Sequence, residues 1–498
     1  MSLRLKIAFS FAFAFVIAVL AGGSLSQAAA APSPAAGISP ALCGPGDAKE
    51  PGLQGDVPAG LTQWQYNCGV RLVGQLPLVG NVQGVGTCAY VRTRDSMVHV
   101  IDVSDPAKPK EVKSVPVKYA SETMRVVVNK ERAILVSGSS VYDIRDCLNP
   151  VLMGEIKWPP LAVGVSPPAG GGGGAGMLPH DLRVNHAGTK VYGAYGLWEV
   201  DITNLKDPES WKVSDLRCEI LSQLPGPWQE MHRWAIKAGR SLCVDAADPN
   251  GANYRLAASG TQTLMLWPTL GHSPDVSGDD RTVYLADQAP YGATAWQPGP
   301  MMRIVDVSQR PAKLLGQVAG PGHGLDWFRA GGRDYVVHSN ERGSTVLPAP
   351  GGVKLPAGDP CKPYPRPTSL GWAFEAIVSD VTNPARARNV AMLQIAINNP
   401  ENCAARKASG RDPWIAYHLV DNVYDAHFAA VNFGSAGLRI YDIRPPTKPY
   451  EVAYFNHGPL VHAGVGYYDA ARGLIYAPGS SGFWVLEVEP QVRARLGI

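Results

Sequence analysis

Short runs of alternating apolar and polar residues follow one another along most of the chain, separated by turns rich in glycine and proline. Alternation with a period of two is typical of β-strands that bury one face. One unit recurs: a strand ends in an acidic residue, a turn follows, and a proline often comes soon after. The acidic residues of these turns are Asp102, Asp143, Asp201, Asp306, Asp380 and Asp442, with a weaker copy at Glu487. A repeat of roughly forty to fifty residues with four short strands predicts the blade of a β-propeller.

The chain is therefore predicted to be all-β, a single β-propeller of seven or eight four-stranded blades over residues 70–490, followed by a tail at 491–498. The unit at 230–268 lacks the acidic turn but has the right length, which favours eight blades. The last unit stops after its third strand. Residues 70–78 resemble a missing fourth strand, so we expect them to close the ring and cover a bare sheet edge.

The repeated turn, best seen where Asp102 is followed by Asp105 and Pro106, resembles that of the LVIVD-repeat family of bacterial propellers. The resemblance covers about residues 70–490 and implies the propeller architecture. It implies little about chemistry, because propellers include enzymes, binding proteins and scaffolds.

The N-terminal residues indicate export. Basic residues Arg4 and Lys6 precede an apolar run over residues 7–20 and a small-residue stretch at 28–31, which predicts a signal peptide over residues 1–31 and a periplasmic or secreted protein. The alternative is an uncleaved membrane anchor, although the run is short for a membrane span. Removing Arg4 and Lys6 lowers the formal net charge from +3 to +1, so neither nucleic acid nor an anionic membrane is an expected partner.

All eight cysteines follow the predicted signal peptide, and an even number in an exported chain favours disulfides. Residues 32–69 form an N-terminal extension that contains two of them. Pairing by proximity along the chain joins Cys43 to Cys68, Cys218 to Cys243 and Cys361 to Cys403, which leaves Cys88 for Cys147. Spacing alone leaves the other connectivities open.

When the repeats are aligned, a histidine recurs at the start of the innermost strand of most units, although the first unit lacks one. These histidines are His180, His232, His272, His323, His418 and His462, and Glu122 takes the same place in the second blade. Innermost strands line the axis of a propeller, so we expect the side chains to converge at one mouth of a central channel. A ring of imidazoles on a rigid scaffold suits a transition metal, with copper favoured and iron or zinc as alternatives. The competing interpretation is structural, with each histidine hydrogen-bonded to a neighbouring blade.

Several acidic residues lie close to these histidines along the chain. Asp275, Asp326 and Asp421 each follow a predicted ligand by three residues, and Asp181 follows His180 directly. They are candidates to orient the imidazoles, or else turn-forming residues. Glu122 is the candidate catalytic group, as a general base, a ligand or a group that orients a ligand, or else the partner of Arg125 in a salt bridge.

Three other histidines, His186, His338 and His427, fall outside the register and are predicted not to bind metal, whereas His457 lies close before the last inner strand. Two stretches, the glycine run at 170–176 and the Pro- and Gly-rich insertion at 343–371, are expected to form loops at the channel mouth.

The preferred functional hypothesis is an exported metalloprotein, an oxidoreductase or lyase that acts on a small organic molecule. In outline the arrangement resembles three groups of propeller metalloenzymes, namely carotenoid-cleavage oxygenases, nitrous oxide reductase and the selenium-binding/methanethiol oxidase family, and this resemblance implies redox chemistry. The alternatives are a non-catalytic interaction propeller and a metal-free lyase or hydrolase that uses histidine and glutamate as acid and base.

Overall fold

The fold is taken from a computed structural model of the 498-residue chain. The structure describes residues 40–58, 60–118, 123–158, 181–194, 197–216, 219–220, 223, 273–286, 301–319, 324–339, 376–402, 404–405, 408, 418–458, 466–479 and 481–498. The predicted signal peptide at 1–31 lies outside these residues.

The strands form seven antiparallel blades of a β-propeller, as predicted. Blades 1 to 3 consist of β3 (Asn81–Val85), β4 (Cys88–Arg92), β5 (Met97–Asp102) and β6 (Lys110–Pro116); β7 (Met124–Val128), β8 (Ala133–Ser137), β9 (Ser140–Asp143) and β10 (Val151–Glu155); and β11 (Leu182–Val184), β12 (Lys190–Gly193), β13 (Trp198–Asp201) and β14 (Lys212–Asp215). Blades 4 and 5 consist of β15 (Ser273–Val276), β16 (Thr282–Ala286), β17 (Met301–Asp306) and β18 (Lys313–Ala319); and β19 (Leu325–Ala330), β20 (Arg333–Ser339), β21 (Ala376–Asp380) and β22 (Arg388–Leu393).

The last two blades each include a strand from the N-terminal part of the chain. Blade 6 consists of β23 (His418–Val420), β24 (Phe428–Asn432), β25 (Leu438–Asp442), β26 (Tyr450–Asn456) and β1 (Tyr66–Cys68). Blade 7 consists of β27 (Tyr467–Asp469), β28 (Leu474–Gly479), β29 (Gly482–Val488) and β2 (Val70–Leu76). The helix α5 (Pro490–Leu496) and short 3-10 turns at Pro208–Ser210, Pro384–Arg386, Ala396–Asn398, Pro400–Asn402 and Gly434–Ala436 complete the described elements. None of the described helices has the length and apolarity needed to cross a bilayer.

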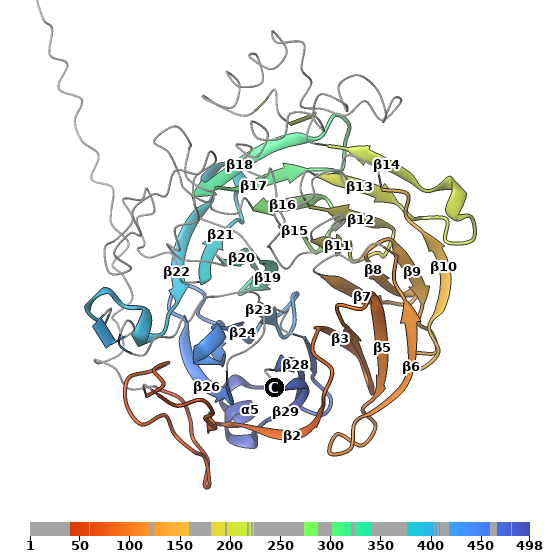
Figure 1. Ribbon diagram of the computed structural model, residues 1–498. Helices are drawn as coiled ribbons and strands as arrows, with labels where there is room; N and C mark the ends of the chain where they lie inside the picture. The colour runs from red at the N-terminus through yellow and green to blue at the C-terminus, as the bar shows by residue number, and fades with distance from the viewer. Residues whose placement is uncertain are drawn as a thin grey trace, which may run out of the picture.

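The blades stand around a common axis, with the first strand of each blade innermost (Figure 1). Seven apolar clusters of buried residues hold neighbouring blades together, one cluster at each interface. One of them joins Tyr192 of blade 3 to Val283 and Val305 of blade 4. Because blades 3 and 4 pack directly on each other, no blade stands between them. The described strands therefore form seven blades and not the eight that were preferred, and residues 230–268 lie outside the described part.

The ring closes as the sequence predicted, because β2 pairs antiparallel with β29 as the fourth strand of blade 7. Val70 lies opposite Val488 and Leu76 opposite Phe483, with a bulge between Leu72 and Gly74. Gly74 is needed at this bulge, because a Cβ there would lie 2.2 Å from the carbonyl oxygen of Pro106 in blade 1. The strand β2 thus joins the N-terminal part of the chain to blade 7 and covers the edge of that blade.

The acidic turn of the repeat has a physical role in the structure. In six blades an Asp at the end of the third strand accepts a hydrogen bond from the backbone N–H two residues later, at 2.8 to 3.1 Å; these are Asp102, Asp143, Asp201, Asp306, Asp380 and Asp442. This Asx turn reverses the chain toward the outermost strand. In blade 7 the longer Glu487 instead pairs with Arg71 at 2.7 Å, which explains why its copy of the motif is the weakest.

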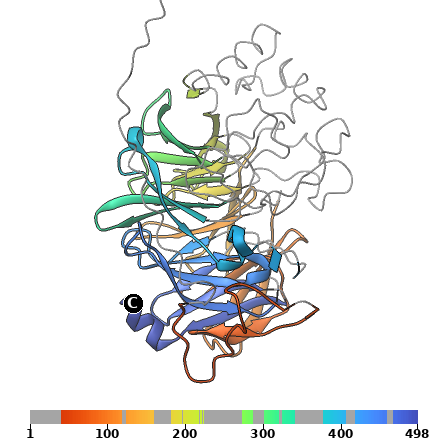
Figure 2. The same cartoon turned by 90° about the vertical axis from the view of Figure 1, so that its left-hand side faces the viewer.

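The N-terminal extension packs on blade 6 and on α5. Figure 2 shows the ring from the side, with α5 and the extension on the same rim, and the N–H of Glu489 donates to the carbonyl of Gly69 at 3.0 Å. The guanidinium of Arg439 is fully buried and pairs with Glu50 from the extension and with Glu451. A buried cation is stable only when it is paired, so this contact fixes the extension to the blade.

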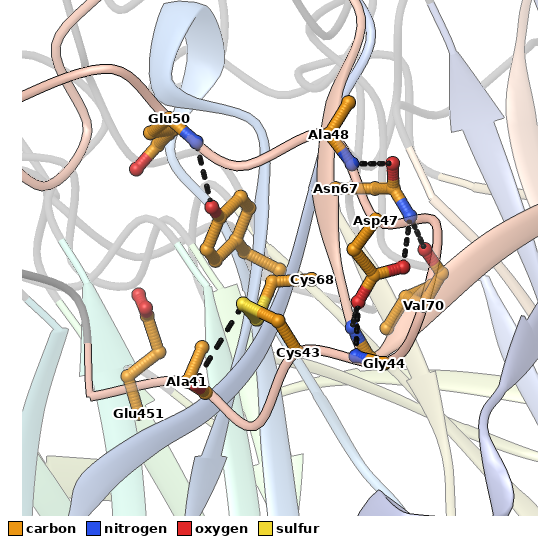
Figure 3. The surroundings of a disulfide bond; sticks show 12 residues. Ala41, Cys43, Gly44, Asp47, Ala48, Glu50, Asn67, Cys68, Val70 and Glu451 are labelled. Carbon is orange, nitrogen blue, oxygen red and sulfur yellow. Dashed lines mark hydrogen bonds between the residues drawn. A yellow bond between two sulfur atoms is a disulfide. The ribbon is translucent and has the colours of Figure 1, made fainter.

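Two of the four predicted disulfides are confirmed, Cys43–Cys68 within the extension and Cys88–Cys147 between blades 1 and 2. The other four cysteines lie outside the described residues. Figure 3 shows the surroundings of the first bond. The carboxylate of Asp47 accepts from the N–H groups of Gly44 and Gly69, each at 2.7 Å, and so holds the two ends of the disulfide-closed loop together.

Candidate functional site

Of the predicted site residues, only His418 lies in the described part of the chain; Glu122, His180, His232, His272, His323 and His462 lie outside it. Along the chain, most of them stand shortly before the first residue of an innermost strand. His418 is the first residue of β23, and His272 directly precedes β15. Glu122, His180 and His323 stand two residues before β7, β11 and β19, and His462 stands five before β27. His232 precedes no innermost strand of its own among the described blades.

His418 is held by a carboxylate from the neighbouring blade. Its side chain is fully buried, and its Nδ1 lies 2.5 Å from Oδ2 of Asp326 on β19. Although burial raises the pKa of Asp326, His418 and Arg183 outweigh this and lower it. Asp326 is therefore a carboxylate that accepts, and Nδ1 carries the proton. The second ring nitrogen, Nε2, is buried and has no hydrogen-bond partner among the described residues. A buried imidazole nitrogen without a partner is costly unless it binds something.

Further charged side chains from three more innermost strands surround this pair. Arg183 of β11 pairs with Asp275 of β15 and lies 3.3 Å from Asp326 of β19. Since Arg183 reaches past blade 4 to blade 5, these side chains meet on the axial side of the sheets. Together with Arg125 of β7 and His418, they form what we call the axial cluster: Arg125, Arg183, Asp275, Asp326 and His418, one residue from each of blades 2 to 6.

The carboxylates of the axial cluster are extensively bonded. Asp275 is fully buried, and it accepts from the backbone N–H of Val276 at 2.7 Å and from that of Trp327 in the next blade. Burial raises the pKa of Asp275, whereas Arg183 opposes that rise. A related contact joins blades 3 and 4, where the hydroxyl of Ser273 donates to Asp181.

Arg125 differs from Arg183 because no carboxylate of the described residues forms an ion pair with it. Within the described part of the chain, an Nη donates to the carbonyl of Met124 at 3.3 Å, and the buried Nε has no partner. Burial and the nearby positive charge of Arg183 lower the pKa of Arg125. Glu122, predicted as a possible partner of Arg125, lies outside the described residues.

One of the acidic residues, Asp421, does not pair with the histidine that its position along the chain indicates. Asp326, which lies on blade 5, accepts a hydrogen bond from His418 of blade 6. Asp421 does not orient His418; it lies 2.9 Å from Nδ1 of His427 and accepts from the backbone N–H groups of His427 and Phe428. It is the turn-forming residue of the alternative interpretation. Pairing across blades depends on the stagger between strands, which a single repeat does not reveal.

The histidines outside the register lie away from the axial cluster. His338 is buried on β20 and lies 2.8 Å from the hydroxyl of Ser379, while His427 is held by Asp421. His186 follows the end of β11 and packs against Tyr424 and Trp327, with ring centroids 5.3 and 6.1 Å apart. His186 and Tyr424 stand beyond the ends of innermost strands, whereas His418 stands at a start, so this aromatic group lies toward the opposite end of the ring.

Two other groups bear on metal chemistry. His457 stacks on Phe455 with ring centroids 3.9 Å apart, and burial lowers its pKa to about 4, so the imidazole is neutral at physiological pH. Cys43, Asp47 and Cys68 have the compactness of a metal site. The two sulfurs are joined in a disulfide, which leaves no thiolate to bind a metal.

Sequence reasoning missed the two arginines of the axial cluster. Arg125 was considered only as a partner of Glu122, and Arg183 was not weighed at all. A signal was present, because both stand in otherwise apolar innermost strands, directly after Met124 and Leu182. A charged residue in a buried strand needs a partner or a ligand. No protein-family model matches this chain, and the comparison with curated proteins found no match.

Proposed function

We propose that the protein is an exported β-propeller metalloprotein that holds a transition metal at the end of the ring where the innermost strands begin. The observation that supports this proposal is His418, whose buried Nε2 has no partner in the described part of the chain while its Nδ1–H is held by Asp326. Metal-bound histidines usually donate their other ring N–H to a carboxylate or carbonyl, which fixes the tautomer and raises the basicity of the ligating nitrogen. His418 and Asp326 have this arrangement.

The remaining ligands are proposed from the register: His180, His272, His323 and His462, with His232 and Glu122 as further candidates. Three or four protein ligands suffice for a typical site and leave one position open. Copper is the favoured metal, with iron or zinc as alternatives, since neutral imidazole suits all three. Such a metal supplies redox or Lewis-acid chemistry, and we propose oxidation or lyase chemistry on a small organic molecule. Membership of the LVIVD-repeat family remains part of the proposal.

Export is supported by the two disulfides, because such bonds form and persist in oxidising compartments. Together with the predicted signal peptide, they favour the periplasm or the extracellular space.

The test is the metal content of protein purified without a histidine tag, as isolated and after reconstitution with copper, iron and zinc in turn. We expect near-stoichiometric metal in the wild type and its loss in the His418→Ala variant. The matched control is His427→Ala, which also removes a carboxylate-paired histidine but away from the axial cluster. Absence of metal from the reconstituted wild type, or equal loss in both variants with the fold intact, contradicts the proposal.

A second candidate is a metal-free enzyme in which the same pair acts as general base, with Asp326 orienting His418 and Nε2 accepting a proton. The geometry that favours it is the same hydrogen bond to Nδ1. Turnover that survives exhaustive chelation distinguishes it from the metalloprotein. If neither metal nor turnover is found, the remaining hypothesis is a non-catalytic interaction propeller.

A further inference from the structure

Among the residues that the structure describes, no carboxylate forms an ion pair with Arg125, whereas Arg183 pairs with Asp275 and Asp326. A guanidinium carries five N–H donors. In Arg125 one hydrogen bond is made, to the carbonyl of Met124, and the Nε–H is buried without an acceptor. The residue is half-buried on the innermost strand of blade 2. A cation in such a place is stabilised only when an anion reaches it.

The other charged groups of the cluster are already engaged with one another. Arg183 is neutralised by Asp275 and by Asp326, and Asp326 also holds His418. The two arginines lie close enough for the positive charge of Arg183 to act unfavourably on Arg125. Asp326, Asp275 and Asp181 act favourably on Arg125 through their charges. Within the described residues, the contacts of these carboxylates go to other groups, namely Arg183, His418, Ser273 and backbone N–H groups, so the guanidinium N–H donors of Arg125 are not used by them.

We infer that Arg125 binds the carboxylate of a small organic acid and so holds the substrate beside His418. Arginine forms two parallel N–H···O bonds with a carboxylate, and such charge-assisted pairs are among the stronger hydrogen bonds in proteins. A singly charged anion is favoured over a dianion such as phosphate, because Asp275 and Asp326 lie in the same cluster and repel additional negative charge. This inference rests on the proposed function, since it names the substrate class of the same site.

The experiment compares benzoate with benzamide, which has the same ring and nearly the same shape but no charge, and adds inorganic phosphate. Binding is measured by calorimetry and by the shift in Tm, on the protein as isolated and after chelation. We expect benzoate to bind and to raise Tm with its concentration, benzamide to have little effect, and phosphate to bind more weakly than benzoate. Arg125→Gln should weaken benzoate binding roughly tenfold or more, because a hydrogen bond to a charged group is lost.

Arg145→Gln is the matched control, since Arg145 is exposed and pairs with Asp143 on the outer part of blade 2; it should bind benzoate like the wild type. Arg125→Lys keeps the charge without the planar fork and should retain part of the affinity, which keeps the test informative if the glutamine variant does not fold. Equal binding of benzamide and benzoate, unchanged benzoate affinity in Arg125→Gln, or no response to benzoate at millimolar concentrations overturns the inference.

The outcomes for metal and for substrate class are separate. If the metal proposal alone fails, the reconstituted protein lacks metal but still distinguishes benzoate from benzamide through Arg125. If the carboxylate inference alone fails, the protein holds metal at normal stoichiometry in both arginine variants and does not distinguish the two probes.

Discussion

Replacing Asp326 by Asn should weaken metal binding while preserving the fold. Asp326 is mostly buried, with 13% of its side chain exposed, and contacts two groups, His418 through Nδ1 at 2.5 Å and Arg183 at 3.3 Å. Asn has almost the same shape and still accepts a hydrogen bond from Nδ1–H. What it removes is the negative charge that raises the electron density on the imidazole and fixes its orientation.

The size of the effect follows from this loss. A charge-assisted hydrogen bond is roughly twice as strong as a neutral one, so the orientation of His418 is held less firmly. Changes to such outer partners of metal ligands typically cost about 10- to 100-fold in metal affinity. That range corresponds to about 1.4 to 2.8 kcal/mol of binding free energy. Because Arg183 keeps Asp275 as a partner, the cluster is not left with an isolated cation.

The assay is a competition titration of the apoprotein with copper or zinc against a chelator of known affinity, with unfolding curves recorded for each variant. Asp421→Asn is the matched control, because it alters another Asp–His pair, with His427, outside the axial cluster. An Asp326→Asn variant whose metal affinity stays within a factor of about two of the wild type refutes the reasoning. So does an equal loss in Asp421→Asn.

Two further predictions concern stability. Arg439→Met should lower the free energy of unfolding by about 3–5 kcal/mol, because it leaves Glu50 and Glu451 buried without their cation. In urea titrations, adding Glu50→Gln and Glu451→Gln should restore much of this loss. Equal stability of the single and triple variants contradicts the prediction. Burial lowers the pKa of His457 to about 4, so the unfolded chain takes up this proton first as the pH falls. His457 therefore contributes stability above pH 6.5 that is lost between about pH 6.5 and 4, by roughly 1 to 3 kcal/mol, and His457→Gln should flatten that part of the stability profile.

The sequence by itself determined the architecture, and it predicted a site where the innermost strands begin. Alternation of apolar and polar residues marks strands, and an Asp that bonds the N–H two residues later marks the turn after the third strand, so both features are local and visible along the chain. The closing strand, here β2, was predictable because the last repeat lacked its fourth strand. Cys43–Cys68 agrees with pairing by proximity, and Cys88–Cys147 agrees with the pair that this pairing leaves.

The tertiary structure alone decided how many blades close the ring and which side chains meet at its axis. Residues 230–268 have the length of a blade, but the packing of Tyr192 against blade 4 leaves no space for one. Asp326 and His418 are 92 residues apart and belong to different blades, so their contact depends on the stagger between neighbouring sheets. The partners of Arg125 and Arg183 likewise depend on how several innermost strands come together around the axis. Periodicity within a strand is a local property, whereas charge compensation in a buried cluster is a property of the assembled ring.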